Sequence, residues 1–487
     1  MNDDRKRIDI LDHEIMDKLE ERFRIVKRIG EYKQKHQLPI HHPIREQEIL
    51  QKACLYDYHE EIQAVYQTIF NSSRQLQACS YGLIGKSLPY TLSPMIYQAM
   101  GIDRYQIIET DHFRKTVEKI AYQGLNVTIP YKEEAYHFCD ELDESSQKTK
   151  VVNTLIGKKG YNTDYMALMD IFTSKTITFH HEKIVIIGNG ATARSMDAAI
   201  HEVAKRNLAT NYSITHVVRS LKGPLDVLLD KVDSLKDATI LINATSYGTS
   251  PNYENEPLFS IDSWEQLKWV LDVVYNPLNT PLLQKARKKG IPTINGFQLL
   301  VLQASRSAQL MMGKSVDGEA LYHKLLPDIQ NIVLIGMPYS GKSYLGRELK
   351  KAYNRPLYDF DEILKDRGQD LPTLLSQGAS IDDFRTFEKV LALELADIRG
   401  AILVPGGGIV LSPESMRVLK RNAIIVYLET PMATLIERID GTRPLVKSSK
   451  DLDHLAQERI TYYERYADFS VQEEEGVINK IYENCYH

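Results

Sequence analysis

The sequence predicts a multidomain chain in which an all-α segment precedes two α/β units, and three observations support this. Its 487 residues exceed what one hydrophobic core organises, because domains average about 100–200 residues. Residues 1–78 show helical periodicity and almost no glycine. From about residue 80, β-rich runs alternate with helical stretches, and a glycine-rich loop opens a further α/β unit after Asn331. We therefore expect domains at 1–78, 79–327 and 328–487, with Pro327 stopping the helix before the last boundary.

The composition is that of an ordinary globular protein. Apolar residues make up 43% and charged residues 26%, and the net charge of −5 is too small to indicate nucleic-acid binding. The mean hydropathy is −0.32, and no apolar run approaches the ~18 residues of a membrane span. The N-terminus lacks the apolar core of a secretory signal. The four cysteines have no paired spacing, which favours reduced thiols. We expect a cytoplasmic protein without nucleic-acid or membrane partners.

Two cations interrupt an apolar stripe along the first predicted helix. Arg22 and Lys33 lie eleven residues apart, close to three turns, and so share a face about 16 Å apart. Ser73 and Gln77, at i and i+4 on a later helix, add neutral hydrogen-bonding groups from one face. The pattern fits either long side chains that reach solvent or an anion site inside a helical bundle.

Arg5 lies 17 residues before Arg22, or about 25 Å along a straight helix. One small ligand therefore cannot contact both arginines of the same copy, and a functional Arg5 must reach a neighbouring subunit's site. A first helix of this length also needs a partner to bury its stripe. Both arguments predict a homodimer formed through the N-terminal helices.

This pattern, with the stretch Pro43-Ile44-Arg45-Glu46, resembles the all-helical chorismate mutase family. The resemblance implies that arginines hold the two carboxylates of chorismate, while a lysine and a glutamine hydrogen-bond its ether oxygen. It assigns catalysis to Arg22, Lys33 and Gln77, and substrate binding to Arg5 of the other chain, Arg45, Glu46 and Ser73. His42 stands where the family usually has an acidic residue. Two alternatives stay open: a mutase, or a ligand-sensing dimerisation module.

A dinucleotide-binding pattern lies in the central unit. Residues 183–193 read as a strand, a glycine turn and a helix start, with Gly188, Gly190 and Ala193 in the G-x-G-x-x-A positions. The glycines let pyrophosphate approach the backbone, and the helix N-terminus favours its charge. The next strand ends at Arg219, which either is a surface charge or suits the 2′-phosphate of NADP.

A lysine and an aspartate suggest proton transfer beside a hydride donor. Lys132 follows the short strand Asn126–Thr128, and Asp164 follows Asn162-Thr163. A Lys–Asp pair that faces a carbonyl makes a suitable couple for general acid–base chemistry. The sequence does not show that these two side chains meet.

The central unit resembles shikimate dehydrogenase along essentially its whole length. The motifs are Gly85–Pro94, Asn126–Lys132, Val152–Thr154, Asn162–Asp164, Asn243–Ser246, Asp272–Tyr275 and Gln303-Ala304. The resemblance implies a substrate lobe at about 79–165 plus 296–327 and a Rossmann NADP lobe at about 166–295. It makes Lys132 and Asp164 the catalytic pair. The implied substrate-binding residues are Thr91, Ser93, Thr128, Asn153, Tyr275 and Gln303, and the NADP-binding residues are Gly188, Gly190, Ala193, Arg219 and Thr245.

The C-terminal unit opens with a strand and the loop Gly336-x-x-x-x-Gly341-Lys342-Ser343. In such a P-loop the backbone amides cradle phosphates, the lysine neutralises the β- and γ-oxygens, and the serine ligates Mg²⁺. This predicts an ATP-dependent phosphoryl transfer and leaves the acceptor open.

Downstream residues narrow the acceptor. Asp359 and Asp361 should point to one side of a strand end. Arg385 precedes a helix, and glycines follow the strand 402–404. This set, with Arg443-Pro444-Leu445 and Arg459, resembles shikimate kinase. The resemblance implies that shikimate is bound by Asp361, Arg385, Gly407, Gly408 and Arg459, that Asp359 supports Mg²⁺, and that Arg443 closes over ATP. Lys342, Asp361 and Arg443 would act in the transfer, and Gly336, Gly341, Lys342 and Ser343 would hold the nucleotide.

Together the patterns predict a multifunctional enzyme of the shikimate pathway. It would reduce 3-dehydroshikimate with NADPH, phosphorylate shikimate with ATP, and rearrange chorismate to prephenate. The alternative is a bifunctional dehydrogenase and kinase whose N-terminal helices sense a ligand.

Overall fold

The computed structural model describes residues 2–35, 43–77, 80–88, 91–102, 105–120, 122–221, 223, 226–250, 257–441, 443–472 and 476–486. Within these ranges the side chains of residues 2, 31, 33–35, 71, 74–77, 80 and 486 are not described. The chain forms two compact units, 1–162 and 163–487, and each is described by itself. Among the described residues, no helix is both long enough and apolar enough to cross a membrane.

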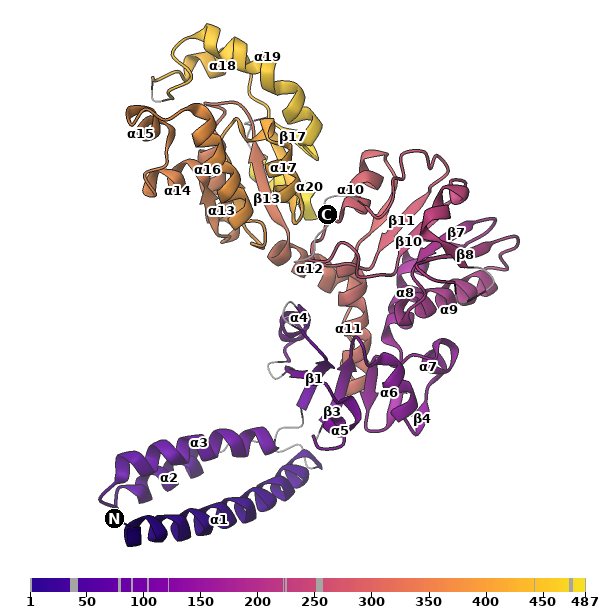
Figure 1. Cartoon of the computed structure of the whole chain (residues 1–487), viewed down its shortest axis with the longest axis vertical. Coiled ribbons are helices and arrows are strands. Elements are labelled where there is room, and N and C mark those ends of the chain that lie inside the picture. The colour runs from indigo at the N-terminus through magenta and orange to yellow at the C-terminus, as the bar shows by residue number, and fades with distance from the viewer. Residues whose placement is uncertain are drawn as a thin grey trace. The chain divides into compact units, whose positions relative to one another are not determined.

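The first unit begins with three helices (Figure 1). They are α1 (Asn2–Lys35), α2 (Pro43–Ala53) and α3 (His59–Gln77). Helix α3 packs against both others, and Phe70 and Val26 are among the few side chains that this packing buries. Much of the apolar stripe on α1 stays exposed, with Ile8 and Ile15 each 55% accessible. This helical region therefore buries too little apolar surface to account for its own stability.

A six-stranded sheet follows in the same unit, in the order β2-β1-β3-β5-β6-β4. Its strands are β1 (Ser80–Gly85), β2 (Tyr105–Glu109), β3 (Tyr122–Val127), β4 (Glu141–Leu142), β5 (Thr154–Ile156) and β6 (Lys159–Tyr161). Its helices are α4 (Ser93–Ala99), α5 (Phe113–Val117), α6 (Lys132–Phe138) and α7 (Glu144–Thr149). The buried core contains Ile84, Phe113 and Leu125. β1 and β3 run parallel, so Gly85 and Thr128 follow neighbouring strand ends.

The second unit opens with α8 (Thr163–Ser174), which packs against α11 (Gly296–Met312). Helix α12 (Gly318–Ile329) follows α11 and contacts it. The expectation that Pro327 stops this helix is wrong by two residues, because α12 runs on to Ile329. A proline removes only its own N–H from the ladder, and the Gln330 N–H still donates to the Leu326 carbonyl at 2.9 Å.

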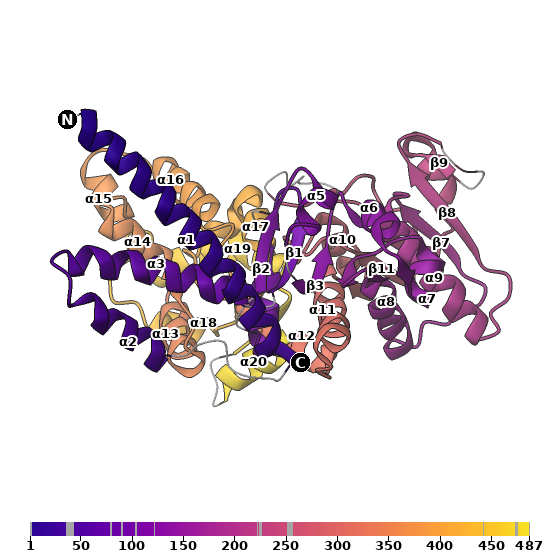
Figure 2. The same ribbon diagram turned by 90° about the horizontal axis from the view of Figure 1, so that it is seen from below.

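A parallel six-stranded sheet has the order β12-β11-β10-β7-β8-β9, which is the doubly wound dinucleotide-binding order. Helix α8 lies side by side with α9 (Ala191–Arg206) in Figure 2. The strands are β7 (Lys183–Ile187), β8 (Ser213–Val218), β9 (Asp226–Leu228), β10 (Ile240–Asn243), β11 (Trp269–Asp272) and β12 (Thr293–Ile294). The helices are α9 (Ala191–Arg206) and α10 (Pro281–Lys288), with a 3₁₀ turn at Leu229–Leu235. Val185, Leu241 and Trp264 belong to the core.

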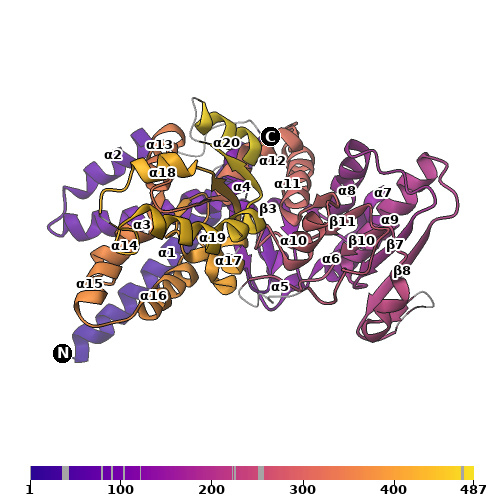
Figure 3. The same ribbon diagram turned by 90° about the horizontal axis from the view of Figure 1, so that it is seen from above.

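The C-terminal region holds a parallel five-stranded sheet in the order β14-β15-β13-β16-β17. Several of the helices in this region, coloured orange to yellow, are labelled in Figure 3. The strands are β13 (Asn331–Ile335), β14 (Leu357–Asp359), β15 (Ile402–Val404), β16 (Ala423–Leu428) and β17 (Phe469–Val471). The helices are α13 (Lys342–Tyr353), α14 (Phe360–Asp366), α15 (Leu371–Ser376), α16 (Ile381–Glu394), α17 (Pro413–Lys420), α18 (Met432–Glu437), α19 (Ser449–Tyr466) and α20 (Val477–Tyr486), with a 3₁₀ turn at Ile409–Leu411. β13 is central and completely buried. The carboxyl ends of β13, β14 and β15 are therefore neighbours at one edge, where α/β sheets bind ligands.

Candidate active sites

A cavity of about 670 Å³ opens at this edge of the C-terminal sheet. It collects nearly every residue that the sequence assigned to phosphoryl transfer. Those that line it are Gly341, Lys342, Ser343, Asp359, Asp361, Arg385, Gly407, Gly408, Arg443 and Arg459. Gly336 contributes its backbone carbonyl to the same loop. Because these residues come from strand ends and helix starts far apart in sequence, the sheet topology assembles the cavity.

The P-loop residue Lys342 is 9% exposed and holds its own loop. Its Nζ donates to the carbonyls of Gly336 and Met337, each at 2.9 Å. Burial lowers the pKa of Lys342 to about 8, with the cation Arg443 lowering it further and Asp361 opposing both. Gly341 adopts a left-handed φ of 89° immediately before α13, a conformation that glycine reaches without strain. The loop thus presents a helix N-terminus and a lysine to one space, which is an anion site.

Two aspartates stand at the end of β14, although not as the sequence predicted. Only Asp359 ends the strand, whereas Asp361 lies in the first turn of α14. The cause is local capping, since the Asp359 carboxylate accepts from the Asp361 N–H at 3.1 Å and starts the helix. Asp361 forms an ion pair with Arg443. Arg443, which the sequence predicts to close over ATP, therefore contacts Asp361, the carboxylate predicted to bind the acceptor.

Arg385 is fixed by a partner that sequence reasoning left without a role. It forms an ion pair with Glu388, which is 1% exposed, and both lie on α16, which begins at Ile381 rather than after Arg385 as expected. Burial raises the pKa of Glu388, with the Arg385 charge acting against that rise. A Cβ at Gly408 would lie 1.9 Å from an Arg385 nitrogen, and one at Gly406 would lie 2.4 Å from a Glu388 oxygen. The glycines therefore allow this ion pair to approach the backbone. In the sequence, the i,i+3 spacing of Arg385 and Glu388 is the pattern that could have indicated this ion pair.

Arg459 is 4% exposed and lies on α19. Its Nε donates to the Glu458 carboxylate at 3.0 Å. Four residues later, the Tyr463 hydroxyl donates to the Gly407 carbonyl. The last long helix is thus attached to the glycine loop, and it carries a buried cation into the cavity.

In the second unit, the glycine turn between β7 and α9 is the segment that the sequence predicts to hold a dinucleotide. Gly188 has a φ of 99°, and a Cβ there would lie 2.8 Å from Thr245 Cγ2, so only glycine fits. Gly190 caps α9, Ala193 is buried in its first turns, and Arg219 is exposed just after β8. The amide and hydroxyl of Thr245 both donate to Asn243 Oδ1, at 3.1 and 2.7 Å.

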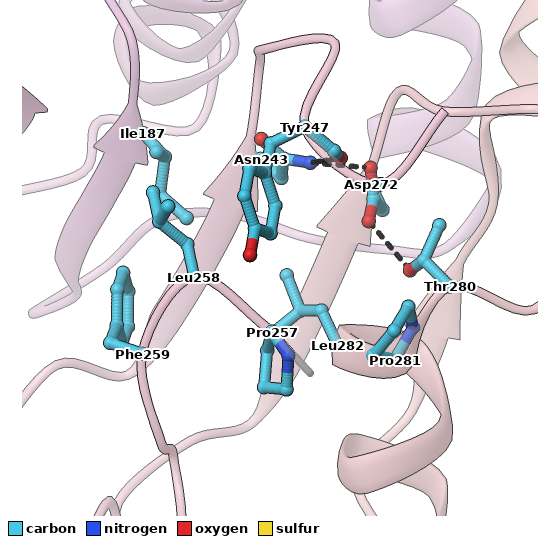
Figure 4. Close-up of a pocket in the computed structure, with 11 residues that line it drawn as sticks. Ile187, Asn243, Tyr247, Pro257, Leu258, Phe259, Asp272, Thr280, Pro281 and Leu282 are labelled. Carbon is cyan, nitrogen blue, oxygen red and sulfur yellow. Dashed lines mark hydrogen bonds between the residues drawn. The ribbon is translucent and has the colours of Figure 1, made fainter. Parts of the chain in front are cut away.

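A buried carboxylate, that of Asp272, bonds to Asn243 and Thr280 (Figure 4). Asp272, 1% exposed, accepts from Asn243 Nδ2 at 2.9 Å and from the Thr280 hydroxyl at 2.6 Å. Burial raises the pKa of Asp272 to about 6, and its hydrogen bonds oppose the rise. The adjacent space is about 20 Å³ and mainly apolar, with Ile187 and Leu258 in its wall. That volume holds about one water molecule, so Asp272 positions Asn243 and Thr245 and does not bind substrate there.

The expected substrate residues of the central unit fall on both sides of the division at residue 162. In the first unit, the hydroxyls of Thr91 and Ser93 lie 3.2 Å apart. Lys132 begins α6, and its carbonyl accepts from the Val152 N–H at 3.1 Å, next to Asn153. Thr128 precedes α6 by a short turn.

The remaining residues of that set lie in the second unit. Asp164 is in the first turn of α8, and its neighbour Thr163 donates to Gln303 Oε1 at 3.3 Å. Tyr275 follows β11 and is half-buried. Lys132 and Asp164 lie in different units, and their pairing stays a prediction.

In the helical region, Arg22 Nη1 donates to Ser73 Oγ at 2.5 Å, and Ser73 is 5% exposed. Burial lowers the pKa of Arg22, and the charge of Arg45 lowers it further. This places Arg22, Ser73 and Arg45 near one another. Arg5 is exposed, and Glu46 is half-buried. The side chains of Lys33 and Gln77 lie outside the described part of the chain, as does His42.

The central part of the chain is similar to curated proteins of one family. It is 33% identical over 258 residues to the shikimate dehydrogenase (NADP(+)) of Saccharolobus solfataricus, a match that covers 50% of this chain and 93% of that protein. It is also 33% identical over 257 residues to the shikimate dehydrogenase of Sulfurisphaera tokodaii, with the same two coverages. The chain belongs to the shikimate dehydrogenase family. The model of the shikimate dehydrogenase substrate binding domain matches residues 83–155 of it.

Two further domains flank the dehydrogenase. The chorismate mutase type II model matches residues 4–78, and the shikimate kinase model matches residues 338–487. A solved chorismate mutase/shikimate 5-dehydrogenase fusion protein from Clostridium acetobutylicum shares 28% identity, with a TM-score of 0.46, over 51% of this chain and 97% of that one. The chain is thus a multifunctional shikimate-pathway enzyme of aromatic amino-acid biosynthesis, as the sequence predicted.

Proposed function

We propose that the chain reduces 3-dehydroshikimate with NADPH, phosphorylates shikimate with ATP and Mg²⁺, and converts chorismate to prephenate. The observation that carries the kinase part of this proposal is the 670 Å³ cavity, which gathers the P-loop, four aspartates and four arginines around one space. The first two reactions are consecutive, because the product of the reduction is the acceptor of the phosphoryl group. A shared chain raises the local concentration of that intermediate.

In the kinase, each proposed role follows from the position of a side chain. Lys342 and the α13 N-terminus balance the charge of the transferred phosphate. Arg385, held by Glu388, and the buried Arg459 offer cations to the carboxylate of a small acceptor. Asp361 orients the acceptor hydroxyl once Arg443 turns from this aspartate to the phosphates.

Magnesium fits the residues present beside Lys342. Ser343 offers a hydroxyl and Asp359 a buried carboxylate to the same cavity, and Mg²⁺ characteristically combines one or two such ligands with phosphates and waters. When bound, the ion shields the charge of the transferred phosphoryl group.

In the dehydrogenase, the Gly188 turn would take pyrophosphate, and Arg219 would take the 2′-phosphate that distinguishes NADP from NAD. The bound cofactor supplies the hydride. Lys132 and Asp164 would exchange the proton of the reacting oxygen, while Thr91, Ser93 and Asn153 orient the ring by hydrogen bonds.

In the helical domain, we propose a homodimer in which the exposed stripe of α1 is buried by a second copy. Ile8, Ile15 and Met16 are each at least 55% exposed on one helix, and burying such a side chain stabilises by about 1.5–3 kcal/mol. Sedimentation of the double variant Ile8→Asp/Ile15→Asp should give a monomer. Leu208→Asp, at a site 83% exposed in the Rossmann lobe, is the matched control and should sediment as the parent does. A monomeric parent would contradict this dimer.

The decisive experiment assays three reactions on one preparation of the full chain: shikimate-dependent NADP⁺ reduction, shikimate-dependent ADP release and chorismate consumption. Lys132→Ala should abolish the first and leave the second intact. Chorismate binding without turnover would replace the mutase assignment by a ligand sensor. Loss of both dehydrogenase and kinase activities in Lys132→Ala would contradict separate sites, and absence of all three in the parent chain would contradict the proposal as a whole.

A further inference from the structure

A histidine outside every motif contacts the nucleotide-binding turn. His216 lies on β8 and is paired in register with Ile186 of β7 and Asp226 of β9. Its side chain is 14% exposed. Nδ1 lies 2.8 Å from the carbonyl oxygen of Gly188, and Nε2 lies 3.1 Å from the carboxylate of Asp197 on α9. One ring therefore bridges the fingerprint glycine and the helix that follows it.

The chemistry of the two partners determines the protonation state. A backbone carbonyl and a carboxylate are both acceptors, so each ring nitrogen must carry a proton to satisfy both contacts. A neutral imidazole has one donor and one lone pair, and would turn that lone pair toward either Gly188 or Asp197. The hydrogen bond to Asp197 is the main influence that raises the pKa of His216 above its usual value. Burial opposes the rise, and the Gly188 carbonyl and the charge of Asp226 support it.

The same strand holds Gly188 from its other side. The Gly188 N–H donates to the Val217 carbonyl at 2.8 Å. Both polar backbone groups of Gly188, whose φ is 99°, are thus bonded to consecutive residues of β8. The orientation of this peptide decides where the following amides of the turn point, and these are the groups that a pyrophosphate would contact.

We propose that His216 is a positioning residue for the nicotinamide cofactor, which as an imidazolium fixes the Gly188 turn and makes cofactor affinity decrease at alkaline pH. The proposal rests on the proposed NADP site. The direction of this pH dependence follows from the number of N–H donors on the ring. Below the folded-state pKa of His216, the ring donates to both Gly188 and Asp197, and one of these bonds is lost as pH rises through that pKa. The positive charge lost at the same time also lies near the cofactor phosphates.

The test is an equilibrium titration of the full chain with NADPH between pH 6 and 9.5. The dissociation constant of the parent should rise about threefold to tenfold across the His216 transition, beyond any change due to the cofactor's own phosphate. In His216→Leu that transition should disappear and affinity at pH 6.5 should be lower, while kcat with saturating NADP⁺ changes little. In Asp197→Asn the transition should move to lower pH, because the carboxylate that stabilises the charge is gone.

His201 provides the matched control, since it lies on α9 and, within the described part of the chain, its ring forms a side-chain hydrogen bond only with the Tyr212 hydroxyl, at 2.7 Å. His201→Leu should retain the parent's pH profile, and kinase activity should be unchanged in every variant. Identical profiles for the parent and His216→Leu would overturn the role of His216. A parent chain that binds no NADPH at any pH would instead overturn the proposed cofactor site.

Discussion

The kinase pocket and the N-terminal helices place their cations in contrasting ways. In the kinase, Arg385 and Arg443 each form an ion pair inside one compact unit, and Lys342 is buried beside them. In the helical domain, Arg5 and Arg45 are exposed on separate helices. A parallel sheet brings strand ends from distant sequence positions to one edge, whereas a helix distributes its residues along its length. The first architecture can complete a site within one chain, whereas for the second we propose that another copy is needed.

The strongest test of this contrast is Lys342→Ala. It removes the buried cation that faces the phosphates, and we expect kinase kcat to fall about 10³-fold, the scale of losing one preorganised charge. Dehydrogenase and mutase rates should keep their parental values, because Lys342 begins helix α13 in the C-terminal region and lines only the cavity there. Lys350→Ala, at an exposed lysine on the same helix, is the control and should retain full activity. A comparable loss in the control would mean that α13 is sensitive to any change of charge.

Intersubunit complementation tests the other half of the comparison. Arg5→Ala and Arg22→Ala should each lower mutase turnover by about 10²-fold, since each removes a carboxylate-binding cation. If Arg5 acts in the partner's site, an equal mixture that exchanges subunits should recover about a quarter of parental activity, because half the dimers carry one intact site of two. Kinase activity in the same mixture should stay constant. A mixture no more active than its components would place both arginines in one chain's site.

The two regions should also differ in their response to pH. Because the pKa of Lys342 is lowered to about 8, this lysine loses its charge as pH rises from 7 to 9, and ATP binding should weaken by up to about tenfold per pH unit above 8. Calorimetry in buffers of different ionisation enthalpy should detect proton uptake on ATP binding in that range. The arginines of the helical domain stay charged there, so the KM for chorismate should vary less. An ATP affinity constant to pH 9.5 would contradict the lowered pKa.

Local motifs explain how much of the molecule was predictable. The P-loop and the glycine turn are contiguous in sequence and need only a strand before and a helix after, so their positions follow directly. The sheet orders confirm the doubly wound and P-loop architectures. Asp361 was predicted at a strand end because the alternation of side chains along β14 was extended two residues beyond Asp359. In the structure the Asp359 side chain caps α14, so the helix has already started at Phe360. The end of α12 was placed two residues too early, at Pro327, because the Gln330 N–H still completes the ladder by donating to the Leu326 carbonyl.

Residues that act through another residue left only a weak signal in the sequence, such as the i,i+3 spacing of Arg385 and Glu388. Glu388 supports Arg385 from one helical turn away, but its burial follows from the fold of the whole sheet. His216 bonds to a glycine 28 positions earlier in the chain, a contact that only the pairing of β7 with β8 creates. Contacts between sequence-distant strands are a property of topology, so motif reading locates ligand-contacting residues better than their supports.

The smallest expected effect concerns the helix that carries Arg385 and Glu388. Ser380 caps α16 in a reciprocal box: it accepts from the Asp383 N–H at 3.2 Å, and its own N–H donates to the Asp383 carboxylate at 2.8 Å. Ser380→Ala should cost about 1 kcal/mol of stability and, by loosening the first turn, raise the KM for shikimate about threefold to fivefold in the kinase assay. Ser412→Ala removes the cap of α17, which carries none of the proposed site residues, and should cost similar stability with an unchanged KM. The hydrogen bonds from Ser380 lower the pKa of Asp383. The stability that the Ser380 cap gives to α16 should therefore be lost only in acid, as pH falls below the usual pKa range of the carboxyl group. Equal KM values for the two variants would show that the kinase pocket holds Arg385 through its ion pair alone.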